Sequence, residues 1–89
     1  MREARWVEML TRCLRRLGKS AENIVVDRKS TAWKASVALR LKETTQASNR
    51  WLAEQLRMGR PEAVSVYVGR LKKTGAEKVP SYRELTTIV

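Results

Sequence analysis

One short stretch of the chain combines a guanidinium, a carboxylate, a hydroxyl and a branched apolar group, in Arg60, Glu62, Ser65 and Val66. A guanidinium can donate two parallel hydrogen bonds to guanine, and a carboxylate can accept from the amino group of cytosine. A hydroxyl can pair with several base edges, and an apolar group can contact the thymine methyl. On one exposed face of a regular element, these side chains would be able to read bases.

Basic residues lie on both sides of this stretch. Those expected to contact DNA as well are Arg50, Arg57, Arg70, Lys72 and Lys73. Arg70, Lys72 and Lys73 follow the base-reading candidates and would lie farther along the same element. We therefore expect these three to meet phosphate groups, which position a protein on DNA without reading its sequence.

The pattern before residue 57 predicts a short helix with one buried side. The Ser48 hydroxyl can accept a hydrogen bond from the free amides that open a helix. Leu52, Ala53 and Leu56 then recur at helical spacing and form an apolar stripe, while Arg50 and Arg57 face outward. Because Ala53 is small, a second helix can cross closely at that point.

A second helix is predicted after a tight turn. Gly59 can end the first helix in the left-handed conformation, and Pro61 suits a first helical turn. Val64, Val68 and Leu71 form the buried stripe of the second helix, which leaves the candidate contact residues wholly or partly exposed. Residues 48–73 are therefore interpreted as a helix-turn-helix.

The turn departs from the commonest bacterial helix-turn-helix pattern. That pattern has a glycine four residues after the packing alanine and a branched apolar residue ten after it. Here those positions hold Arg57 and Ala63, and the glycine and valine come at Gly59 and Val64. We expect a turn one or two residues longer, as in the variants of the Trp repressor and of bacterial replication initiators.

Charge decides between two interpretations of this helix pair. Two amphipathic helices joined by a Gly-Pro turn also describe any small helical bundle. The chain, however, has 19 Lys and Arg against 9 Asp and Glu, a formal net charge of +10 and a pI near 10.7. A field of this strength attracts polyanions at long range, so pattern and charge together favour nucleic acid binding.

The sequence offers no set of residues for catalysis, and we expect no enzyme, no cofactor and no metal. Cys13 is alone and His is absent, which excludes an internal disulfide and a Cys/His zinc site. Tyr67 and Tyr82 lack a metal-ligand cluster that would activate them. Glu43 and Glu54 have basic neighbours and are expected to form surface ion pairs. Without a targeting or membrane-spanning segment, the chain is expected to be cytoplasmic and reduced.

The periodicity of the remaining chain predicts an all-α bundle of four or five helices. Further helices are expected over 2–17, 21–26 and from Ser30 or Thr31 to about Glu43. The Thr and Ser residues of 44–48 favour a bend. Residues 1–73 would form the DNA-binding domain, and 74–89 a mobile or loosely packed tail.

One core should hold these helices together, with the tryptophans as anchors. Trp51 is the exception, since it adjoins the apolar stripe of its helix and could be partly exposed. The expected core residues are Trp6, Leu10, Leu14, Val37, Leu41, Leu52, Leu56, Val64 and Val68.

Over residues 14–73 the chain resembles the C-terminal segment of REP-associated tyrosine transposases. The specific pieces are Arg40-Leu-Lys-Glu-Thr-Thr45 and Trp51-Leu-Ala-Glu-Gln-Leu-Arg-Met-Gly59. Leu14-Arg-Arg-Leu-Gly-Lys-Ser20 and Asp27-Arg-Lys-Ser30 are similar but weaker. The resemblance implies a helical DNA-binding appendage. It does not carry over catalysis, because the family's metal site needs a His-hydrophobe-His pair.

The sequence thus predicts DNA as partner and no membrane, in a bacterial, transposase-associated DNA-binding module. A second copy of the chain, in a homodimer, and a catalytic transposase domain remain open as further partners. The alternatives are a small stand-alone transcriptional regulator and a basic helical protein-interaction module. An RNA binder would more often show exposed aromatic residues on a sheet or a loop that clamps the backbone, and neither is visible.

Overall fold

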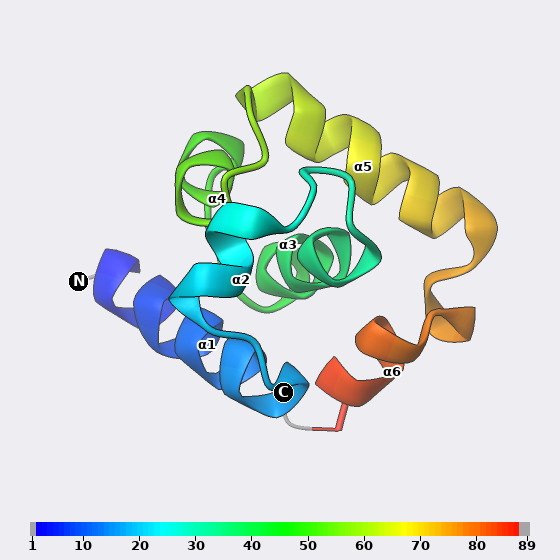
Figure 1. The fold of residues 1–89 in the computed structure, drawn as a ribbon, viewed down its shortest axis with the longest axis horizontal. Coiled ribbons are helices and arrows are strands. Elements are labelled where there is room, and N and C mark those ends of the chain that lie inside the picture. The colour runs from blue at the N-terminus through cyan, green and yellow to red at the C-terminus, as the bar shows by residue number, and fades with distance from the viewer. Residues whose placement is uncertain (1, 88–89) are drawn as a thin grey trace.

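Six α-helices and one short 3-10 helix form the fold in a computed structural model that describes residues 2–87 (Figure 1). The described residues contain no strand, so the predicted all-α class is confirmed. One helix more than expected is present because the end of the chain also folds. The helices are α1 (Arg2–Leu17), α2 (Ala21–Val26), α3 (Ala32–Thr44), α4 (Asn49–Gln55), α5 (Pro61–Thr74), η1 (Ala76–Lys78) and α6 (Pro80–Leu85).

Helix α3 lies at the centre of the molecule, with α1, α5 and α6 packed around it (Figure 1). It is buried on almost every side, including the polar residues Lys34 and Ser36, neither of which is exposed to solvent. Its sequence therefore lacks the two-sided pattern of a surface helix. Thr45 ends it, and the Thr45 hydroxyl donates a hydrogen bond of 2.6 Å to the carbonyl oxygen of Leu41.

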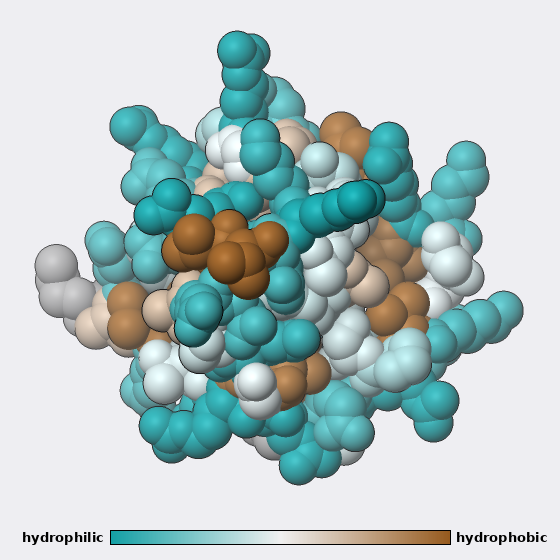
Figure 2. All heavy atoms as spheres, in the orientation of Figure 1, coloured by the Kyte–Doolittle hydropathy of each residue, from teal (hydrophilic) through white to brown (hydrophobic). Residues whose placement is uncertain are grey.

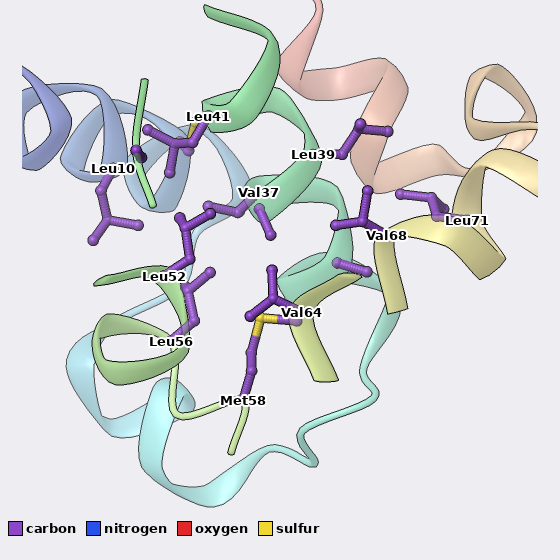
Figure 3. Packing of buried hydrophobic residues seen from close by; sticks show 14 of the residues in the cluster. Leu10, Val37, Leu39, Leu41, Leu52, Leu56, Met58, Val64, Val68 and Leu71 are labelled. Atoms are coloured by element: carbon purple, nitrogen blue, oxygen red, sulfur yellow. The ribbon is translucent and has the colours of Figure 1, made fainter. Parts of the chain in front are cut away.

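The core forms where α4 and α5 meet α3. Figure 3 shows Leu52 of α4 and Leu56, which follows the last residue of α4, directed toward Val64 of α5 and Val37 of α3. All four side chains are fully buried, and burying a side chain of this size contributes about 1.5–3 kcal/mol. Most of the expected core residues are buried. The buried residues that periodicity did not single out include Trp33, Ala35, Leu39, Ala47, Met58 and Leu85.

The burial of Trp6 and Trp51 is the reverse of what was expected. Trp51 is buried, with 8% of its surface exposed, whereas Trp6 is only partly buried, as is Leu14. The rings of Trp6 and Trp51 meet edge to face, with their centroids 5.4 Å apart. Trp6 thus covers Trp51, and the contact between α1 and the start of α4 could not be seen in the pattern of either helix alone.

The turn between α4 and α5 has two left-handed residues. The predicted cap at Ser48 is confirmed, since its side chain accepts a hydrogen bond of 3.1 Å from the Trp51 amide. Arg57, with φ 52°, and not Gly59 is the first left-handed residue after α4, although Gly59 also has a positive φ of 94°. Met58, between them, is fully buried and anchors the turn to the core.

The tail is packed, in contrast to the expected mobile or loose segment. Leu85 of α6 is fully buried, and α6 packs against α1 and α3. The hydroxyls of Ser36 and Ser81 are 2.8 Å apart, and the Tyr82 hydroxyl donates a hydrogen bond of 2.6 Å to Glu43. These contacts join segments far apart in the sequence. Residues 88 and 89 of the expected tail lie outside the described residues.

Candidate nucleic-acid interface

Helix α5 lies along the edge of the molecule with one side free of other elements (Figure 1). Its inner side is formed by Val64, Val68 and Leu71, all buried. Helical geometry places Glu62 and Val66 near the centre of the opposite side. Val66 has 47% of its surface exposed, so its apolar side chain is available for contact on this side of the helix.

Every predicted contact residue is exposed to solvent. Those on α5 or at its start are Arg60, Glu62, Ser65, Val66, Arg70, Lys72 and Lys73, and the other two are Arg50 and Arg57. Arg60 is the residue that precedes the first turn of α5. Its exposed side chain therefore extends from the N-terminal end of the helix, which is the part that a groove-bound helix offers to base edges.

A chain of hydrogen bonds runs from α3 across the start of α4 to α5. The Lys42 ammonium donates to Asn49 Oδ1 at 2.6 Å, and Asn49 Nδ2 donates to the Ser65 hydroxyl at 2.7 Å. Asn49 of α4 therefore contacts Ser65 directly and links it to the Lys42 cation of α3. The sequence analysis named neither Lys42 nor Asn49 as a contact residue.

Two of the predicted cations already have partners within the protein. Arg50 forms an exposed ion pair of 3.4 Å with Glu54. Such a pair contributes less than about 1 kcal/mol, so an arriving phosphate can replace the carboxylate at little cost. The guanidinium of Arg70 lies 5.9 Å from the ring centre of the half-buried Tyr67, which orients it along α5.

Arg57 belongs to a different part of the surface. It lies in the turn and lines a groove with Arg28 and Lys29 from the loop before α3. The structure therefore separates Arg57 from the outer face of α5, with which it had been grouped. Arg28 and Lys29 were not predicted as contact residues, because nothing local in the sequence places residues 28 and 57 together.

Two titratable side chains away from α5, Cys13 and Tyr82, have pKa values that are shifted by burial within the fold. Burial raises the pKa of the Cys13 thiol to about 11, although the nearby Arg40 charge acts in the opposite direction. The thiol is therefore protonated near neutral pH and a poor nucleophile. Burial also raises the pKa of Tyr82, and the hydrogen bond with Glu43 adds to this effect.

Residues 2–87 contain no group of three or more His, Cys, Asp or Glu side chains that could hold a metal ion. In the same part of the chain, no helix has the length and apolar character needed to cross a bilayer. No family model, no curated protein and no solved structure matches this chain. Its function is therefore inferred from its own residues and their arrangement.

Proposed function

We propose that this chain binds DNA through α4 and α5, with the outer side of α5 in the major groove. The observation that carries the proposal is the exposed face of α5, which bears polar and basic side chains in a chain of net charge +10. A helix of 14 residues is about 21 Å long and, with side chains, about 10–12 Å wide. The major groove is about 12 Å wide and admits such a helix.

The N-terminal half of α5 would then contact bases, and its last turn would contact phosphate groups. Arg60, Glu62 and Val66 lie in the half that faces base edges, and their chemistry suits guanine, cytosine and the thymine methyl respectively. Lys72 and Lys73 lie in the last turn and would contact phosphate. Ser65 would act with Asn49 and Lys42, since the hydrogen bonds between them fix its position.

As a biological role we propose a transposase-associated DNA-binding module, on the basis of the resemblance of residues 14–73. A stand-alone transcriptional regulator would use the same surface. The two roles differ in what is encoded beside this chain. A catalytic domain with a His-hydrophobe-His pair and a tyrosine nucleophile would support the module, and its absence would support the regulator.

Protein interaction is a second candidate because two neighbouring valines of α2 are unburied. Val25 and Val26 have 60% and 67% of their surface exposed. Figure 2 shows an apolar patch over α2, surrounded by hydrophilic residues. Exposed apolar side chains are common on soluble proteins, however, and interaction patches usually cover several hundred Å². The patch is therefore weaker support than the charged face of α5.

The test of DNA binding measures the affinities of variants for a selected duplex and for random DNA, and so distinguishes base recognition from attraction by charge alone. A preferred site is first enriched from a random duplex library. Arg60→Ala should then weaken binding to this site by about 1–3 kcal/mol and have little effect on random DNA. The double variant Lys72→Ala, Lys73→Ala should weaken binding to all sequences alike and reduce the salt slope by roughly two.

A matched control removes the same charge elsewhere. Arg5→Ala with Arg15→Ala deletes two exposed cations of α1, which does not pack against α5. This double variant should keep most of the affinity. Equal losses for the α1 and α5 double variants would indicate binding by net charge alone. Equal losses for Arg60→Ala on selected and random DNA would exclude base reading by Arg60.

A further inference from the structure

A groove of about 800 Å³ separates the loop between α2 and α3 from the turn between α4 and α5. Its walls carry three cations, Arg28 and Lys29 from the loop and Arg57 from the turn. The side chain of Lys29 extends along the turn, because a Cβ built on Gly59 would lie 3.5 Å from its Cδ and 3.6 Å from its Nζ. Two segments far apart in the sequence thus bring their charges to one open depression.

Two carboxylates, Asp27 and Glu54, also line the groove, and in the described residues neither forms an ion pair with the three cations. Asp27 accepts a hydrogen bond of 2.8 Å from the Trp33 indole, and Glu54 pairs with Arg50. Within residues 2–87, no ion pair engages Arg28, Lys29 or Arg57. The indole is neutral and leaves the Asp27 charge in place, so the groove has three cations against two carboxylates, of which Glu54 is already paired with Arg50. The lining thus keeps an excess of positive charge.

A further positive charge lies close to the groove. Lys34 is fully buried, and the Arg57 charge helps to lower the pKa of its ammonium group. Lys34 lies near the groove because its ammonium group donates a hydrogen bond of 3.0 Å to the carbonyl oxygen of the lining residue Asp27. Burial is the main cause of the pKa shift, the Asp27 charge opposes it, and the Arg57 charge adds to it. An anion held by Arg57 would therefore offset part of the repulsion between the two cations, beside the attraction that Asp27 already supplies.

Arg57 occupies a backbone conformation that favours glycine. Its φ of 52° is the only positive value at a non-glycine residue in the described part of the chain. Holding a side chain there costs roughly 1–3 kcal/mol, and such strained positions cluster at functional sites. Glycine would avoid the strain but would remove the guanidinium. Arg57 thus combines a backbone cost with a charge that lines the groove.

The groove lies on one flank of α5, opposite the Ser65 contacts. Tyr67 lines the groove, while Ser65 bonds to Asn49. Two residues correspond to about 200° around a helix, so these side chains leave α5 on opposite flanks. A helix in the major groove has a sugar-phosphate strand on each side. In that placement Lys42 would lie toward one strand and the cationic groove toward the other.

We infer that the groove holds a phosphate of the DNA strand that runs beside the Tyr67 flank of α5, clamped by Arg28, Lys29 and Arg57. This inference rests on the proposed function and adds a contact that fixes the angle of α5 in the DNA. Arg57 would supply a planar fork of donors to the phosphate oxygens, with Lys29 as a point charge beside it.

The decisive variant is Arg57→Gly, which removes the charge and the backbone strain together. We expect its thermal midpoint to be unchanged or higher than that of the wild type. We expect its salt slope for duplex DNA to fall by about one. At 0.1 M salt this corresponds to an affinity up to roughly eightfold lower, since a slope of about 0.9 per contact acts over one decade of salt. Arg57→Lys is the matched control and should keep the slope.

A second probe tests the groove without DNA. Inorganic tripolyphosphate is titrated into ¹⁵N-labelled wild type and Arg57→Gly, and the amide shifts are followed. The wild type should show shifts concentrated at residues 28–29 and 57–59, and the variant should lose them. Shifts that are spread evenly over all basic segments, or that persist in Arg57→Gly, would overturn the inferred clamp.

The two probes separate this inference from the proposed function. If the wild type binds DNA and Arg57→Gly keeps its affinity and slope, the groove contact is overturned while the α5 interface stands. If the wild type binds no DNA, the inferred contact and the proposed function both fail. Tripolyphosphate shifts at the groove would in that case assign it to another polyanion.

Discussion

The ammonium group of Lys34 donates a hydrogen bond of 2.7 Å to the carbonyl oxygen of Ile24, and thereby fastens α2 to α3. The same group donates to the carbonyl oxygen of Asp27 at 3.0 Å. Helix α2 has no buried residue of its own. Lys34 therefore helps to hold α2 and the loop that carries Arg28 and Lys29, together with the Trp33–Asp27 hydrogen bond and the packing of Ile24 against the core.

Lys34→Met should lower the free energy of unfolding by about 1–3 kcal/mol. The substitution keeps the apolar stem but leaves two carbonyl oxygens without their donor, and an unsatisfied buried polar group costs about that much. Urea denaturation measures the change, with the exposed Lys73→Met as control. A stability equal to that of the wild type would show that these hydrogen bonds do not hold α2.

The stability difference between wild type and Lys34→Met should also depend on pH. Burial lowers the pKa of Lys34 from 10.5; Asp27 opposes this shift and Arg57 adds to it. Below the lowered pKa the lysine is charged in both folded and unfolded states. Between that pKa and 10.5, the unfolded state binds more protons, so the wild type gains stability as pH rises. Denaturation at a series of alkaline pH values measures this, and a constant or shrinking difference would contradict it.

Leu56→Ala should destabilise the protein by about 2–4 kcal/mol, and Val64→Ala by somewhat less. Both side chains are fully buried where α4 and α5 meet, so each truncation leaves a cavity there. Thermal unfolding measures the loss. Val66→Ala, on the exposed side of α5, is the matched control and should change stability by less than about 0.5 kcal/mol. Shifts of under a few degrees for Leu56→Ala and Val64→Ala would disprove the assigned packing.

Gly69→Ala should stabilise the protein by roughly 0.5–1 kcal/mol. Gly69 lies within α5, where alanine is favoured by about that amount. An added Cβ would meet nothing within 4 Å, so no clash offsets the gain. Chemical denaturation tests this directly. A loss of stability would mean that α5 is bent or packed differently at this position.

The sequence predicts best those elements that carry their own signals. Ser48 and the spacing of Leu52 and Leu56 define α4, and Val64 and Val68 define the buried side of α5. The helical period also determines which residues of α4 and α5 point toward solvent, so the exposure of the contact residues followed from the sequence. This exposure does not depend on contacts with distant segments of the chain.

The features that sequence reasoning missed all depend on distant contacts. The ammonium group of the buried Lys34 donates hydrogen bonds to the carbonyl oxygens of Ile24 and Asp27, ten and seven residues earlier. The Ser36 hydroxyl bonds to the carbonyl oxygen of Ala32 and also meets the Ser81 hydroxyl from α6. The burial of Trp51 follows from the ring of Trp6 on another helix. The last helix is too short to show a period, and contacts with distant segments hold it. Leu85 is buried against the other helices, while Ser81 and Tyr82 form hydrogen bonds with residues of α3.

In the candidate site, too, some residues could be predicted from a single helix and others depend on contacts between distant segments. Arg60 and the basic residues of α5 could be predicted from one helix, whereas Lys42 reaches Ser65 only through Asn49. The groove brings the loop at residues 28–29 to the turn at Arg57. Such a grouping depends on how α2 packs on α3, which no local pattern encodes.

The most direct test of the central claim is the affinity of the wild-type chain for duplex DNA as a function of salt concentration. Fluorescence anisotropy with a labelled duplex gives the dissociation constant at each salt concentration. If about four to six phosphates are neutralised, affinity should fall by two or more orders of magnitude between roughly 50 and 200 mM salt. An affinity that does not change with salt, or no binding at the lowest salt concentration, would contradict the proposal that this chain binds DNA through α4 and α5.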